Sequence, residues 1–513
     1  MGSVRTARQR RARRRERGNA GSAATANAPA YIKRQIPTYE LLSEEGLDAI
    51  ERHADRILKE IGIEIRGDDE AHRLFREAGA TVQGDRIRFD EGLAASLCST
   101  APAQFTQHAR NPARSVVIGG DCTVFSPMYG APFVRDLEKG RRYATLEDFE
   151  NLVKLAYLCP WLHHSGGTIC EPVDVAVNKR HLDMVYAHAR WSDKAFMGSV
   201  TLPERAADSI ALCRLLFGES FVAENCVILA NINVNSPLVY DGTVTQVMRT
   251  YASAGQAVVV VPFVLGGAMG PVTVAGSIAQ AHAEALVGVA LTQLVRPGVP
   301  VIYGNFFTTV TLRSGAPTFG MPESALAYIA VGQLARRNRL PFRCGGALTA
   351  SKVADAQAAQ ESADSLMPVI LGGANFILHA AGWLEGALVM GYEKFVLDMD
   401  HLGMMHRFLE GIQLDDNGFA MDAFHEVEPG THFLGCQHTL TNYRTAFFEP
   451  ELTDNLTSEQ WEEAGSTTAE TRAYVRWKEM LANYEAPAID EAIDEEMREF
   501  IAKKKAAMED RWY

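Results

Sequence analysis

Short apolar, β-branched segments alternate with long amphipathic helical patterns between about residues 120 and 400 of this 513-residue chain. Eight such segments are strand candidates, and each is apolar on both faces, which is typical of a buried parallel sheet. Eight strands with helices between them favour an α/β fold of the (β/α)8 class, a TIM barrel, whose usual size is about 250 residues. An open doubly wound sheet is the alternative, although no GxGxxG turn supports its dinucleotide-binding form. The predicted strands are Thr123–Ser126, His164–Ile169, Ala195–Val200, Cys226–Val234, Val258–Val264, Val299–Tyr303, Phe342–Gly345 and Asn375–His379.

The barrel pattern is flanked by segments of different character. We predict a disordered basic tail at 1–34, an N-terminal helical cap at 35–118, the TIM-barrel catalytic domain at 119–450 and a C-terminal helical extension at 451–513. The tail has no apolar stretch of the kind that secretory signals carry. A solvated tail, a transit peptide and a docking arm for an acidic partner protein stay open as its role. The last helix has one apolar stripe and is expected to pack on the barrel or on a sister subunit, so a homo-oligomer is possible.

Charge and cysteine usage restrict the partners and the compartment. The formal net charge is −13, and the stretch from Arg5 to Arg17 holds eight arginines and one glutamate, so the rest of the chain carries about −20. An acidic body argues against nucleic acid as a partner. The eight cysteines include no CxxC pair, which fits a reduced cytoplasmic compartment. The most apolar run, Val258 to Met269, is too short to span a membrane and is predicted to be a buried strand with its exit loop.

The residues at and just beyond the predicted strand ends are amides, glycines and aromatics, with few carboxylates. In a barrel these positions form the active-site face. The composition argues against paired-carboxylate hydrolysis and against a two-metal site. It suits a neutral or cationic substrate held by aromatic faces. The predicted substrate-binding residues are Tyr129, Asn233, Asn235, Phe263, Tyr303, Asn305, Phe306, His379 and Trp383, and catalytic residues stay unassigned.

Within that set the residue types predict different roles. Tyr303 and Trp383 offer the largest π faces for a quaternary ammonium. His379 and the pair Asn233 and Asn235 can hold a carboxylate or orient the substrate by hydrogen bonds. Each position also has a structural reading, because glycine-rich strand ends make tight turns and phenylalanines can plug a barrel mouth.

A histidine-rich segment from His425 to His438 is the candidate for a metal site. His432, Cys436 and His438 could coordinate zinc in principle, which leaves a zinc-dependent hydrolase as an alternative function. Their spacing matches no established zinc motif, and the segment lies beyond the barrel strands. We therefore predict no bound metal.

Several motifs occur in order along nearly the whole chain, from about 35 to 510: Gly130–Glu138, Ala144–Phe149, Asn235–Leu238, Gly270–Gly276, Gln293–Gly298, Gly430–Gly435 and His438–Leu440. Together they resemble the trimethylamine methyltransferase family of corrinoid methyltransferases. The resemblance implies a TIM barrel that moves a methyl group from a methylated amine to the cobalt of a corrinoid (cobalamin) carried by a separate protein. Family members that use trimethylamine carry pyrrolysine in or beside the stretch that here reads Arg343–Gln357, and this chain contains none. In lacking pyrrolysine, the chain resembles the pyrrolysine-free branch of the family, which includes enzymes that demethylate glycine betaine.

The hypothesis from sequence is therefore a methyltransferase that moves a methyl group from a quaternary amine such as glycine betaine to the Co(I) of a cognate corrinoid protein. A quaternary ammonium already carries its charge and leaves as a neutral amine, so the protein's task is orientation and electrostatics. The chain itself is expected to bind no cofactor. The alternatives are another methylated amine or a sulfonium substrate with a different acceptor, the zinc hydrolase, and a non-catalytic betaine-binding protein.

Overall fold

The computed structural model describes residues 29–512. The basic stretch from Arg5 to Arg17 lies outside the described residues, so the predictions made for it stay untested.

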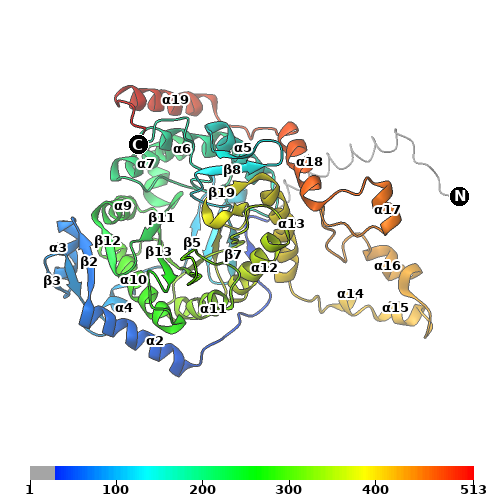
Figure 1. The fold of residues 1–513 in the computed structure, drawn as a ribbon, viewed down its shortest axis with the longest axis horizontal. Coiled ribbons are helices and arrows are strands. Elements are labelled where there is room, and N and C mark those ends of the chain that lie inside the picture. The colour runs from blue at the N-terminus through cyan, green and yellow to red at the C-terminus, as the bar shows by residue number, and fades with distance from the viewer. Residues whose placement is uncertain (1–28, 513) are drawn as a thin grey trace.

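A ring of parallel strands forms the centre of the molecule (Figure 1). Seven strands pair in one continuous parallel order, and the two ends of that order are joined by residues 163–165. In this segment the backbone N–H groups of His163 and His164 donate to the carbonyl of Phe125, and that of Ser165 donates to the carbonyl of Ala195. The ring thus has eight positions, as predicted. The seven strands are β7 (Cys122–Phe125), β10 (Phe196–Met197), β11 (Ile228–Val234), β13 (Ala257–Gly266), β14 (Val301–Gly304), β16 (Phe342–Gly345) and β17 (Phe376–Leu378).

All eight predicted strand segments lie in this ring, although two are much shorter than expected. The segment predicted at Ala195–Val200 forms only the two-residue strand β10. The predicted strand His164–Ile169 pairs only at its start, because the chain turns at Gly166, whose φ of +98° belongs to the left-handed region that glycine tolerates. The apolar run from Val258 forms β13, which confirms the buried strand expected there.

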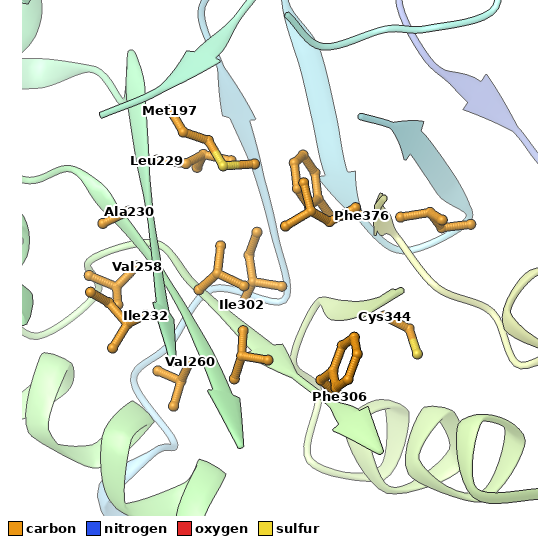
Figure 2. Packing of buried hydrophobic residues seen from close by; sticks show 14 of the residues in the cluster. Met197, Leu229, Ala230, Ile232, Val258, Val260, Ile302, Phe306, Cys344 and Phe376 are labelled. Atoms are coloured by element: carbon orange, nitrogen blue, oxygen red, sulfur yellow. The ribbon is translucent and has the colours of Figure 1, made fainter. Parts of the chain in front are cut away.

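Helices surround the ring, and the strands are apolar on both faces for that reason. Figure 2 shows Met197 beside Leu229, its partner across the β10–β11 pair. On the outer face, α10 packs against β13, and a Cβ on its Gly288 would lie 2.5 Å from a methyl group of Val260. The helices are α5 (Leu146–Leu158), α6 (Arg180–Trp191), α7 (Pro203–Phe217), α8 (Glu219–Glu224), α9 (Gly242–Ser253), α10 (Val274–Val295), α11 (Pro322–Arg337), α12 (Ala356–Leu371) and α13 (Tyr392–Leu409).

Of the described helices, α10 alone is long and apolar enough to cross a membrane, and 83% of its most apolar window is buried inside the protein. Because it packs between β13 and the N-terminal helix α2 (Glu44–Arg56), its apolar character is accounted for by core packing.

The cap packs on the outside of the ring, mainly against α10 (Figure 1). It contains the predicted helices and also a four-stranded sheet, in which β12 comes from the barrel. The side chain of Ser43 accepts from the N–H of Gly46 and caps α2. The other elements of the cap are β2 (Ile63–Arg66), α3 (Asp69–Glu77), β3 (Thr81–Gln83), β4 (Arg86–Arg88) and α4 (Leu93–Leu97), and the strand that the barrel adds to the sheet is β12 (Val239–Asp241).

Two small β-structures cover the ends of the ring. At the strand N-termini, Gln107 of β5 (Gln104–Gln107) donates from its side chain to the carbonyls of Phe196 and Val227, and β5 pairs with β6 (Val116–Gly119). At the opposite end a four-stranded sheet carries Trp383 on its edge strand. That sheet consists of β8 (Phe133–Asp136), β9 (Gly140–Tyr143), β18 (Trp383–Leu384) and β19 (Val389–Gly391).

Beyond α13 the chain leaves the barrel as an arm, residues 410–466, which extends to one side of the molecule (Figure 1). The arm exposes apolar side chains, among them Ile412 and Phe447. The predicted domain boundary at residue 450 falls inside it. The chain then returns through α18 (Ala469–Ala482), which packs on α13, and α19 (Glu491–Ala506), which packs on α6 and α7. The apolar stripe of α19, including Met497, therefore faces this chain's own barrel, while the expected homo-oligomer stays a prediction. The helices of the arm are α14 (Asp416–Phe419), α15 (Met421–Glu426), α16 (Gln437–Asn442) and α17 (Ser458–Glu463).

Candidate functional site

Four of the predicted residues meet at the carboxyl ends of the strands, where they form what we call the aromatic group: Phe263, Phe306, His379 and Trp383. The rings of Phe263 and Phe306 are stacked, with centroids 4.8 Å apart. Phe306 lies 6.1 Å from Trp383 and 6.2 Å from His379. The His379 and Trp383 rings meet edge to face at 4.6 Å. The group thus joins the ends of three different strands through continuous ring contacts.

Local structure fixes each ring. Phe306 opens β15 (Phe306–Thr309), which pairs in parallel with the outer half of β13, so that Phe306 is opposite Phe263. The indole N–H of Trp383 donates to the carbonyl of Thr349 at 3.0 Å. His379 has a φ of +62°, an uncommon conformation for a residue with a side chain, and its backbone N–H donates to the carbonyl of Pro127.

Tyr129 lies beside the aromatic group, and its backbone N–H donates to Nδ1 of His379 at 3.2 Å. Its ring passes over Gly167, where a Cβ would meet the ring at 2.7 Å and Met197 at 2.9 Å. Burial raises the pKa of Tyr129 to about 12, so the phenol is neutral at physiological pH. Its ring therefore adds an uncharged aromatic surface next to His379.

Arg343 lies beneath the aromatic group and is almost completely buried. Its guanidinium donates to the backbone carbonyl of Asn305 at 3.0 Å and approaches Nε2 of His379 at 3.1 Å. Burial lowers the pKa of Arg343 to about 10, which leaves it protonated at neutral pH. Burial, and then the Arg343 charge, hold the pKa of His379 well below its usual value, so that imidazole is neutral.

Sequence reasoning did not single out Arg343 as a site residue. It lies within β16 rather than beyond the strand end, where candidates were sought. The available signal was a lone charged residue inside a strand predicted to be buried on both faces, since arginine is rarely buried without a partner.

Tyr303 lies apart from the aromatic group. Its hydroxyl contacts Nδ1 of His282 on α10 at 2.8 Å, and the ring is fully buried between the sheet and that helix. Side chains alternate along a strand, so Tyr303 points outward from β14 and away from the strand-end face. The expectation that Tyr303 contacts substrate is therefore not supported by this geometry.

The predicted asparagines have different surroundings. Asn235 uses its side-chain oxygen to accept from the backbone N–H of Asp241, so it orders its own turn rather than facing the aromatic group. Asn233 is exposed at the end of β11. Asn305 is buried next to Arg343, and neither its Oδ1 nor its Nδ2 has a partner within the described part of the chain.

The histidine-rich segment lies in the arm, away from the strand ends. Nε2 of His438 contacts the carbonyl of Asn417 at 2.9 Å, and the thiol of Cys436 lies 3.4 Å from the Thr439 hydroxyl. Within residues 29–512 no three His, Cys, Asp or Glu side chains are grouped to hold a metal ion. That the protein binds no metal stays a prediction.

The site is a set of aromatic rings at the strand ends of a barrel, above a buried arginine. Among the described residues, no carboxylate is hydrogen-bonded to the side chains of Arg343, His379 or Trp383. The family model for trimethylamine methyltransferase (MTTB) matches residues 6–509. The chain belongs to this family.

Named relatives narrow the position within the family. The chain is 42% identical over 470 residues to a glycine betaine methyltransferase of Desulfitobacterium hafniense, covering 91% of this chain and 98% of that protein. It is 30% identical to a proline betaine:corrinoid methyltransferase of Eubacterium limosum, covering 75% of this chain and 81% of the relative. A crystal structure of the Methanosarcina barkeri monomethylamine methyltransferase matches with a TM-score of 0.44 and 11% identity, over 86% of this chain and 93% of that one.

Proposed function

We propose that this protein transfers a methyl group from a quaternary amine of the glycine betaine type to the Co(I) of a corrinoid carried by a partner protein. The observation that carries the proposal is the aromatic group at the strand ends. Aromatic faces attract a quaternary ammonium by about 0.5–2 kcal/mol per contact. The resemblance to glycine betaine and proline betaine methyltransferases supports the same substrate class.

The reaction requires no proton transfer from the protein. Co(I) supplies an electron pair to one methyl carbon, the C–N bond breaks, and its electron pair stays on nitrogen. A trimethylammonium carboxylate therefore gives methyl-Co(III) and a neutral tertiary amine that keeps its carboxylate. This chemistry fits aromatic rings and a guanidinium that, among the described residues, have no carboxylate as a hydrogen-bond partner, because no general acid or base is needed.

The rings have to orient the substrate more than bind it tightly. The ammonium charge disappears during transfer, so attraction to aromatic faces favours the substrate over the transition state. Phe306 and Trp383 can restrict the ammonium on one side and leave one methyl directed toward the incoming corrinoid. Such positioning is the main source of rate enhancement available to this site.

The partner and the compartment belong to the same proposal. The acidic body favours a corrinoid protein with basic residues around its cofactor. All eight cysteines are free and buried, which supports a reduced cytoplasmic setting.

A substrate screen tests the proposal. The purified protein is mixed with a Co(I) corrinoid and, separately, with glycine betaine, proline betaine, trimethylamine and a sulfonium compound, and methyl-Co(III) is followed by absorbance. We expect methylation with the betaines. Methylation by trimethylamine or the sulfonium alone would contradict the assigned substrate class, and zinc-dependent hydrolysis without cobalt methylation would contradict the reaction.

A further inference from the structure

Arg343 is a buried cation that has no counter-charge among residues 29–512. Its relative exposure is 1%, and it forms no ion pair with any residue in the described part of the chain. The groups that raise its pKa are Cys344 and Tyr328, which are uncharged at neutral pH, and burial still lowers that pKa. Arginine is almost never fully buried unless it is paired, because an isolated charge loses its hydration. The geometry around Arg343 therefore lacks an anion.

The same cluster has more hydrogen-bond donors than acceptors. Of the guanidinium groups, Nε has no partner, and one terminal nitrogen donates to the Asn305 carbonyl. The other faces Nε2 of His379, whose Nδ1 already accepts from the Tyr129 N–H. A neutral imidazole has one acceptor nitrogen, so with Nδ1 accepting, Nε2 carries a proton and is a donor directed at a donor.

Asn305 brings a second unpartnered group to the cluster. Its side chain is 1% exposed, and neither Oδ1 nor Nδ2, a donor of two hydrogens, has a partner among residues 29–512. A carboxylate is an acceptor-only group with about four lone-pair sites, and a guanidinium can bind it through two parallel N–H bonds. A carboxylate thus satisfies both the charge and the unpaired donors of this cluster.

The fold places this cluster deeper than the aromatic group. Arg343 is the second residue of β16 and pairs with Gly304 and Phe376 on its neighbours. Phe306 and His379 lie beyond the last residues of β14 and β17. A bound molecule with a carboxylate at Arg343 therefore has its other end among the rings, toward the carboxyl ends of the strands.

We propose that Arg343 and Asn305 form the subsite that binds the substrate's carboxylate, an inference that rests on the proposed function. The guanidinium holds the anionic end and repels the ammonium, so the trimethylammonium lies outward among the rings with its methyl groups toward the corrinoid. The site then selects quaternary amines that carry a carboxylate a short distance from nitrogen. Choline and tetramethylammonium lack that group.

Binding without any methyl acceptor tests the subsite. Calorimetric titration of the full chain compares glycine betaine with its methyl ester, which keeps the ammonium and removes the anionic charge. The wild type is expected to bind glycine betaine at least about 100-fold more tightly than the ester. In Arg343→Met that preference disappears, and in Arg343→Lys a reduced preference persists, because lysine keeps the charge but not the planar pair of donors.

A stability measurement separates a binding role from a structural one. Without ligand, Arg343→Met is expected to have a urea midpoint no lower than the wild type, because it removes an unpaired buried charge. The matched control is Arg249→Met. The guanidinium of Arg249 donates to both carboxylate oxygens of buried Asp68, at 2.9 and 3.1 Å. Removing Arg249 therefore leaves the buried Asp68 carboxylate without its ion-pair partner. This control is expected to lower the midpoint and keep the betaine preference.

The outcomes distinguish the two proposals. If the wild type prefers glycine betaine to the ester but does not methylate Co(I), the proposed function fails and the subsite stands. If the wild type methylates Co(I) from glycine betaine, and Arg343→Met keeps the full preference for betaine over ester, the subsite is overturned. Equal affinity of the wild type for betaine and ester overturns it as well. Failure to bind either compound overturns both.

Discussion

The rings of Phe263 and Phe306 are stacked with centroids 4.8 Å apart because β15 adds in register to the outer half of β13. This strand extension carries Phe306 past the end of β14 and places it against Trp383 and His379. The aromatic group is therefore set by backbone pairing.

Replacing Phe306 tests whether this group binds the ammonium. Phe306→Leu keeps an apolar side chain but removes the π face, so KM for glycine betaine is expected to rise about 3- to 30-fold with a smaller change in kcat. The positive charge on the ammonium is largest before methyl transfer. The attraction lost in Phe306→Leu therefore weakens substrate binding more than it raises the barrier to transfer. Steady-state kinetics with saturating corrinoid protein measures both constants.

The matched control is Phe307→Leu. Phe307 is the next residue of β15, is equally buried, and packs near Gly266 on the other face of the strand. The Phe307→Leu variant is expected to leave KM for glycine betaine unchanged. Equal rises in KM for the two variants would mean that the effect comes from loosening β15 rather than from the ring.

Tyr303→Phe tests whether Tyr303 stabilises the fold or contacts substrate. The hydroxyl of Tyr303 contacts Nδ1 of buried His282, so its loss is expected to lower the free energy of unfolding by about 1–3 kcal/mol. KM for glycine betaine is expected to stay at the wild-type value. Urea denaturation and steady-state kinetics check the two parts. A raised KM with unchanged stability would return Tyr303 to the substrate site.

Acid stability depends in part on His188, a buried residue of α6. Its Nε2 donates to the Gly167 carbonyl, and its Nδ1, when the ring is neutral, accepts from the Ser165 hydroxyl, each at 2.7 Å. Burial lowers the pKa of His188 to about 4. In the unfolded chain the pKa is about 6.5, so the unfolded state binds the proton first as the pH falls.

The stability that neutral His188 contributes is therefore complete above about pH 6.5 and is lost as the pH falls toward 4. Its part of the slope is up to about 1.4 kcal/mol per pH unit. Unfolding free energies of the wild type and His188→Gln at pH 7, 6 and 5 measure it, and the variant is expected to show the shallower decline. Parallel declines in both proteins would show that His188 titrates alike in the folded and unfolded states.

Strand periodicity was sufficient to predict the ring and the ends of its strands. That is why Phe306, His379 and Trp383 could be assigned to one site from sequence. The position of Tyr303 could not be predicted in the same way, because a strand end alone does not say which face a side chain takes, and β14 directs this ring toward α10. Arg343 could not be predicted as a site residue, because the sequence pattern does not show which charged groups lie near it in space. Only the structure shows that it is buried without an acidic partner among the described residues.

The most direct measurement of the central claim is the stoichiometry of methyl transfer. Wild-type protein, Co(I) corrinoid and glycine betaine are mixed, methyl-Co(III) is quantified by absorbance, and dimethylglycine is quantified by mass spectrometry. The account predicts that the two products form in equal amounts and that trimethylamine in place of glycine betaine yields neither. Methylation of cobalt by trimethylamine, with none from glycine betaine, would contradict it.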